Sequence, residues 1–168
     1  QAEDGIRDSV ASRGLGDVYK RQVQKLTETL DREVKIDEIY QCLLDTYVVD
    51  PEPYRLVDYD LLPGREQDQR CVARVAVSEN VLTIDGEGSG PIEAFVTALG
   101  ETLNEPVTIL SYQEVGIGTG SDAQAVCIVA IEDKEEGQRC YGLGLSRNTT
   151  TTALNAIISA MNRRWAAA

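Results

Sequence analysis

Two glycine-rich segments have residue types and spacings that could do chemistry. The first, Gly86-Glu87-Gly88-Ser89-Gly90-Pro91, leads into a predicted helix, where converging backbone amides could hold an anion. The alternative, which the local pattern favours, is a tight turn whose glycines adopt positive φ. The Lys-Ser/Thr pair of a P-loop is missing, and so is GxGxxG with an acidic residue about 20 positions later. The segment therefore predicts an anion site or a turn, without a nucleotide-binding fingerprint.

The second segment, Gly116-Ile117-Gly118-Thr119-Gly120-Ser121-Asp122, falls between two predicted strands. Such a loop is more typical of a hairpin connection than of a binding site. Two acidic pairs, Asp85 with Glu87 and Glu132 with Asp133, have the oxygen ligands that a hard cation prefers. Solvated carboxylates on an acidic surface explain these pairs more simply, and we therefore predict no metal site.

The absence of histidine from the 168 residues excludes whole classes of function. Catalytic triads built on histidine and the HxH and HExxH metal clusters cannot form, which removes most hydrolase mechanisms. The four cysteines, at positions 42, 71, 127 and 140, form no CxxC pair, so we expect buried free thiols in a reducing compartment. A net charge of −12 disfavours nucleic acid and anionic membranes as partners. Without an apolar run long enough for a membrane span, we expect a cytoplasmic location.

The first third of the chain divides into two parts with different patterns. Residues 1–22 are rich in Gly, Arg, Asp and Ser, and their ending, DVYKRQ, resembles translated sequencing adaptor. We treat this segment as non-native and expect the natural protein to begin upstream of Val23. Residues 24–47 carry apolar side chains at three- and four-residue steps, which predicts one or two amphipathic helices that end at Asp50-Pro51-Glu52-Pro53. We expect a helical connecting subdomain over 23–53 and the main domain over 54–168.

Residues 54–103 are predicted to form three strands and one helix. In the first strand, Val57, Tyr59 and Leu61 alternate with Asp58 and Asp60, and two more strands are predicted over 71–77 and 81–84. Pro91 suits the first position of a helix, where no backbone amide is required. The apolar face of that helix consists of Ile92, Phe95, Val96, Leu99 and Leu103.

The remaining residues repeat this pattern. Strands are predicted over 107–112, 123–131 and 139–145, followed by a Gly142-x-Gly144 turn and a second helix. The apolar face of the second helix consists of Leu154, Ile157, Ile158, Met161 and Trp165, each 62 residues after its counterpart in the first helix. The paired glycines repeat at an offset of 56. The sequence therefore predicts an α+β fold of two βββα units, each with a helix covering one sheet face. Such small layers leave sheet edges or faces open, which favours a partner copy.

Two short motifs flank the second helix. Asn148-Thr149-Thr150 fits a glycosylation sequon, but capping of the helix by Asn148 or a following threonine is the favoured interpretation. Arg163-Arg164 is interpreted as favourable charge at the helix C-terminus.

Three strings in order, DGEGSGPIEAFVTAL, ILSYQEVGIGTGSDAQA and GLGLSRNTTTTALNAIISAMNR, resemble the C-terminal regulatory domain of 2-isopropylmalate synthase over about residues 54–165. The residues VQKLTETLDREVKIDEIYQCLLDTYV are similar to the connecting subdomain of that family. The resemblance implies a parent acyltransferase that condenses acetyl-CoA with 2-oxoisovalerate in leucine biosynthesis, on a TIM barrel with a divalent metal. Neither the barrel nor its HxH motif is in this chain. We therefore expect no catalytic residue and no cofactor here, with leucine, a second copy and the parent barrel as partners.

In that family, leucine binds between paired regulatory domains. The resemblance implies that backbone amides at a helix start bind its carboxylate, that backbone carbonyls bind its ammonium, and that small and branched residues leave room for its isobutyl group. The positions that match the effector site are Gly88, Ser89, Gly90, Ile92, Ala94, Ile109, Tyr112, Gly116, Ala123, Ala125 and Thr149. Two of them depart from the family pattern: Thr149 replaces a branched aliphatic residue, and Gly116 replaces a common alanine.

Three alternatives remain open from the sequence. The domain could belong to a citramalate synthase, where isoleucine is the usual effector, or it could be a dimerisation module without a ligand. A small phosphate-handling enzyme using the two glycine segments is the weakest alternative, because the chain has no histidine and no lysine beside either segment.

Overall fold

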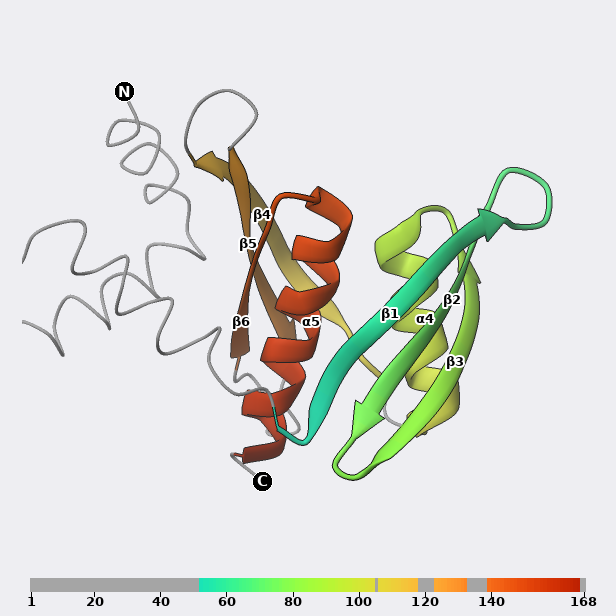
Figure 1. Ribbon diagram of the computed structural model, residues 1–168, viewed down its shortest axis with the longest axis horizontal. Coiled ribbons are helices and arrows are strands. Elements are labelled where there is room, and N and C mark those ends of the chain that lie inside the picture. Colours follow the sequence, from blue (N-terminus) through green and yellow to red (C-terminus); the bar gives the residue numbers. More distant parts are fainter. Residues whose placement is uncertain (1–51, 105, 118–122, 133–138, 167–168) are drawn as a thin grey trace, which may run out of the picture.

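The computed structural model describes residues 52–104, 106–117, 123–132 and 139–166, so residues 1–22 and the helices predicted over 24–47 lie outside the described residues. Within these ranges the chain forms two successive units of three antiparallel strands and one helix (Figure 1). The predicted α+β class and the βββα duplication are therefore confirmed.

The first unit contains strands β1 (Tyr54–Pro63), β2 (Gln69–Val77) and β3 (Asn80–Gly88), in the order β1-β2-β3. Helix α4 (Pro91–Leu103) begins at Pro91, as predicted, because proline needs no backbone hydrogen-bond donor there. β3 is longer than predicted and includes the first two glycines of the glycine-rich segment.

The second unit contains strands β4 (Ile109–Ile117), β5 (Gln124–Glu132) and β6 (Arg139–Ser146), in the order β4-β5-β6. Helix α5 (Thr149–Ala166) follows. The Oδ1 atom of Asn148 accepts a hydrogen bond from the backbone amide of Thr151 at 3.0 Å. The predicted capping of this helix by Asn148 is therefore confirmed.

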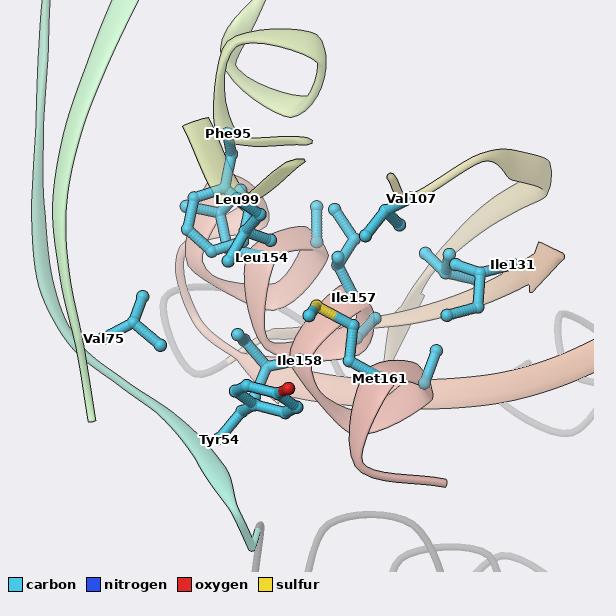
Figure 2. Close-up of a cluster of buried hydrophobic side chains, with 14 of the residues drawn as sticks. Tyr54, Val75, Phe95, Leu99, Val107, Ile131, Leu154, Ile157, Ile158 and Met161 are labelled. Atoms are coloured by element: carbon cyan, nitrogen blue, oxygen red, sulfur yellow. The ribbon is translucent and has the colours of Figure 1, made fainter. Parts of the chain in front are cut away.

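The two units share one hydrophobic core. Figure 2 shows Val75 of β2 and Phe95 and Leu99 of α4 gathered with Leu154 and Ile157 of α5, and all five side chains are fully buried. α5 packs on β5 and β6 of its own sheet and also contacts β1, so that it lies between the second sheet and the first strand of the other unit (Figure 1). Three of the cysteines, Cys71, Cys127 and Cys140, are buried, as predicted, whereas Cys42 lies outside the described residues.

A hydrogen-bonded pair joins the start of β1 to α5. The backbone amide of Tyr54 donates to Oδ1 of Asn162 at 2.8 Å, and Nδ2 of Asn162 donates to the carbonyl oxygen of Tyr54 at 2.9 Å. Both residues are buried, so the side-chain amide satisfies a backbone donor and a backbone acceptor that have lost contact with water.

The predicted glycine turns are wrong, because both glycine pairs lie inside or at the end of strands. Gly86 and Gly88 belong to β3, and Gly142 and Gly144 belong to β6. A Cβ atom on Gly86 would lie 2.7 Å from the carbonyl oxygen of Ala94, and one on Gly142 would lie 2.0 Å from that of Ala156. These glycines are therefore required by the close approach of helix to strand, and not by positive φ.

Strand β1 departs from the predicted alternation. A bulge between Leu56 and Asp58 leaves Val57 without a pairing partner and 38% exposed, while Leu56 and Tyr59 pack against the core. The prediction that Val57 shares one face of the strand with Tyr59 and Leu61 is wrong, because an extra residue reverses the alternation at that point.

The C-terminal turn of α5 also differs from the prediction. Trp165 is 55% exposed, although the four other predicted face residues of this helix are buried. Its neighbour Arg164 faces the sheet edge instead, where Nη1 donates to the carbonyl oxygens of Pro106 at 3.1 Å and Glu132 at 3.5 Å. Arg163 and Arg164 do lie in the last turn, as expected, but Arg164 is a buried hydrogen-bond donor as well as a helix-terminal charge.

Candidate functional site

The start of α4 has the first group of predicted effector residues. The backbone amide of Ser89 donates to Oε2 of Glu93 at 2.9 Å, and the hydroxyl of Ser89 donates to the same oxygen. Both hydrogen bonds lower the pKa of the Glu93 carboxyl, and the bond from the Ser89 hydroxyl has the larger effect. The amide of Ser89 therefore binds a carboxylate of the chain itself, at the place where the sequence predicts the effector carboxylate.

The other residues of this group differ in accessibility. Gly88 and Ala94 face each other across the strand-to-helix contact, with 2.6 Å between a Cβ built on Gly88 and the Ala94 amide nitrogen. Ile92 is partly buried against the core. Gly90 caps the helix in extended conformation, with φ −164°, and a Cβ there would meet no heavy atom within 4 Å. Gly90 is therefore the position in this group where another molecule can approach the backbone closely.

A second group gathers at one end of the second sheet. Gly116 of β4 pairs with Ala125 of β5, and Ala123 directly precedes that strand. The carbonyl oxygen of Ala125 accepts a hydrogen bond from Oγ1 of Thr152 at 3.4 Å, one turn after Thr149 begins α5. The ends of two strands and the start of a helix therefore meet at these residues.

Strand β4 carries the last two predicted residues. Ile109 packs against the core, whereas Tyr112 is 40% exposed and donates its hydroxyl proton to Oε2 of Glu114 at 2.5 Å. Burial, and then the hydrogen bond to Glu114, raise the pKa of the Tyr112 hydroxyl. The pKa of the Cys127 thiol is raised to about 12, mainly by burial and to a smaller extent by the charge of Glu114.

Glu114 is not among the site residues predicted from the sequence, although it lies between two of them on β4. Tyr112, Glu114 and Gly116 follow one another at two-residue intervals, so they share one face of β4. A signal was present in the sequence, because a strand that presents Tyr112 and Gly116 to a ligand must present the residue between them as well.

The structure brings some of the predicted residues together and leaves others apart. The second group converges, and Gly116, like Gly90, has no heavy atom of the described residues within 4 Å of an added Cβ. Among the described residues, no hydrogen bond or strand pairing connects this group with the start of α4. The residues at the start of α4 and those at the Gly116 end of the second sheet therefore form two sets within one chain, and Ile109 lies at the opposite end of β4 from Gly116.

Charged residues of the first sheet are paired with each other. Asp85 accepts hydrogen bonds from Nε and Nη2 of Arg70, and Asp58 accepts the same two bonds from Arg74. These bonds lower the pKa of both carboxyls. Over the part of the chain that the structure describes, no group of three His, Cys, Asp or Glu side chains is placed to hold a metal ion. No described helix is both long and apolar enough to cross a membrane.

Comparison with known proteins identifies relatives that are longer than this chain. This chain is 31% identical over 166 residues to the 2-isopropylmalate synthase of Brucella suis biovar 1, and the match covers 97% of this chain and 29% of the relative. The 2-isopropylmalate synthase of Rhodospirillum rubrum is 34% identical over 152 residues, with 89% and 27% covered. That of Clostridium acetobutylicum is 29% identical over 150 residues, with 86% and 26% covered. The chain thus spans less than a third of the length of these relatives.

A family model described as the LeuA allosteric (dimerisation) domain matches residues 33–165, which include both βββα units. The chain therefore belongs to the family of LeuA allosteric (dimerisation) domains.

Proposed function

We propose that this chain is the regulatory part of a 2-isopropylmalate synthase, and that two copies associate and bind leucine between them for feedback inhibition. The proposal joins the family match over residues 33–165 to the sequence resemblance at the effector positions. The catalytic barrel of the parent enzyme, with its divalent metal, would precede the connecting subdomain. Leucine binding would then bias the paired regulatory domains and change the barrel through a coupling of about 1–3 kcal/mol.

The observation that carries the proposal is the open backbone at Gly90 and Gly116. Both glycines match effector positions, and at both a Cβ atom would meet no atom of the part of the chain that the structure describes within 4 Å. The packed glycines of the same chain, such as Gly86 and Gly142, have helix backbone within 3 Å of the same point. A small ligand or a second copy can therefore approach the main chain at the two matched positions, which is what recognition of an amino acid by backbone groups requires.

The two sets of site residues suit a site shared between copies. The start of α4 and the open end of the second sheet are separate sets within one chain, and a second copy can complete each set with the other. The amide of Ser89 is bound to Glu93 in this structure, so an effector carboxylate would have to displace the Glu93 side chain to reach that amide.

The test is calorimetric titration of the full chain with leucine, isoleucine and valine, together with sedimentation of the chain with and without each ligand. We expect a dimer that binds leucine with a Kd of about 1 µM or weaker, because so small a ligand rarely gains more than about 8 kcal/mol. Stronger binding of isoleucine would favour the citramalate synthase alternative. A folded dimer that binds none of the three would support the ligand-free dimerisation module and refute the sensor.

Gly116→Val provides a matched variant for this test. The added side chain enters open space, so the chain should fold normally while the space beside Ala125 is filled. Leucine affinity should fall at least tenfold. Thr83→Val, at an exposed strand position in the other sheet, should leave leucine affinity unchanged.

A further inference from the structure

The face of β4 that bears Tyr112 and Gly116 also bears a carboxylate. In the register of the second sheet, Tyr112 lies opposite Val129 and Glu114 lies opposite Cys127, and both of these β5 residues belong to the buried core. Glu114 therefore projects from the face on which α5 packs, and not from the opposite face of the sheet. Its side chain is nevertheless exposed, because α5 packs on β5 and β6 rather than on β4.

The charge of Glu114 has no cationic partner among the described residues. The described ion pairs are those of Arg70 with Asp85 and Arg74 with Asp58, both in the first sheet. The hydrogen bond that Glu114 makes in this part of the chain comes from the hydroxyl of Tyr112 to Oε2. The Tyr112 hydroxyl thus fixes one carboxylate oxygen, while Oε1 has no hydrogen-bond donor among the described groups.

The neighbours of Glu114 suit a ligand that is apolar at one end and cationic at the other. The Tyr112 ring lies two residues before it, and the open space at Gly116 lies two residues after it. Glu114 lies opposite the buried Cys127 in the strand register, and its charge, after burial, raises the pKa of the Cys127 thiol. Because the Glu114 side chain is exposed, a cationic group can reach Oε1 from solvent and form a charge-assisted hydrogen bond with it.

We propose that Glu114 binds the α-ammonium group of the amino-acid effector through Oε1, with Tyr112 holding the carboxylate in place. This inference rests on the proposed function, since it requires that an amino acid binds at this end of the sheet. It assigns to a side chain a contact for which backbone carbonyls were expected. It predicts selection for amino acids over the corresponding carboxylic acids, which lack the ammonium.

The experiment compares two ligands that differ in that one group. Leucine and 4-methylpentanoate share the same carbon skeleton and carboxylate, but 4-methylpentanoate has no ammonium. Both are titrated into the full chain, into Glu114→Gln, and into Glu132→Gln, whose altered carboxylate is exposed at the end of β5 away from Gly116. We expect Glu114→Gln to weaken leucine binding at least tenfold and to leave 4-methylpentanoate binding unchanged. Glu132→Gln should change neither.

The outcomes separate this inference from the proposed function. If the unaltered chain binds no branched-chain amino acid, the proposed function fails and the role of Glu114 fails with it. If the unaltered chain binds leucine and Glu114→Gln binds it equally well, only the role of Glu114 is refuted. Equal weakening of both ligands would also refute it, because that result indicates a general disturbance of the site. Should Glu114→Gln not fold, Glu114→Asp, which keeps the charge on a shorter side chain, must show the same selective loss of leucine.

Discussion

Replacing Gly142 by alanine should force α5 away from its sheet. The new Cβ would lie 2.0 Å from the carbonyl oxygen of Ala156 and 2.2 Å from the amide nitrogen of Ala160, both in helix backbone. Ordinary van der Waals contact begins near 3.4 Å, so the helix and the strand must separate by about 1.4 Å. Backbone atoms cannot rotate away as a flexible side chain can, and the displacement would loosen the buried contacts of Leu154 and Ile157.

Overpacking of a core costs about 1–3 kcal/mol, and a backbone clash of this size belongs at the upper end of that range. For a chain of this length, about 3 kcal/mol corresponds to a fall in Tm of about 6–12 °C. Gly86→Ala, with its nearest contact at 2.5 Å, should lower Tm less, and Gly116→Ala, with open space around the Cβ, should change it by about 2 °C or less.

Thermal unfolding followed by circular dichroism, with urea unfolding as a second measurement, gives this ranking directly. The three substitutions are chemically identical, so differences in the unfolded chain largely cancel. The reasoning is refuted if Gly142→Ala and Gly116→Ala have the same Tm, because the close approach of α5 to β6 would then have no energetic consequence.

Two further predictions concern the helix cap and the surface ion pairs. Asn148→Ala removes the acceptor for the Thr151 amide and should lower the free energy of unfolding by about 1 kcal/mol in urea titrations, whereas Asn148→Asp, which keeps an acceptor, should recover most of it. The pKa values of Asp58 and Asp85 are lowered by their arginine partners, so the stabilisation is present above the pKa of an unfolded aspartate, about 3.9, and is lost as pH falls through the folded value. Stability measured from pH 6 to pH 2 should therefore fall less steeply in the Asp58→Asn, Asp85→Asn double variant, and an unchanged slope would contradict the role of the two pairs.

The repeat was predictable from the sequence because packing dictates its spacing. A helix that covers one sheet face must place apolar residues three and four positions apart, and the 62-residue offset shows that both helices meet the same requirement. The prediction failed at Val57, because the alternation of apolar and acidic residues there does not reveal a single inserted bulge residue. It also failed at Trp165, because the last turn of α5 lies at the edge of the sheet, where Arg164 is buried and Trp165 is exposed.

Glycine is ambiguous in a sequence, and this ambiguity limited the prediction of the site. Glycine can adopt a positive φ, allow a helix to approach closely, or leave the backbone open to a ligand. All three roles are compatible with the sequence of the segment from Gly86 to Gly90. The two-residue spacing of both strand pairs, matched by alanines in the helices, is the pattern of close packing. Glu114 was missed because a single acidic residue in an acidic chain is inconspicuous until the strand register places it beside Tyr112.

The pairing of Tyr54 with Asn162 has a mechanical consequence. Tyr54 begins the first strand, and the carbonyl oxygen of Pro53 just before it accepts a hydrogen bond from the amide of Ser78 in the turn between β2 and β3, so tension from the preceding part of the chain reaches both α5 and that turn. That tension is passed to α5, which belongs to the second unit, as well as to the sheet that Tyr54 itself joins. A pull or a twist from upstream would therefore be felt at the far half of the domain, and the two halves should yield together rather than one after the other.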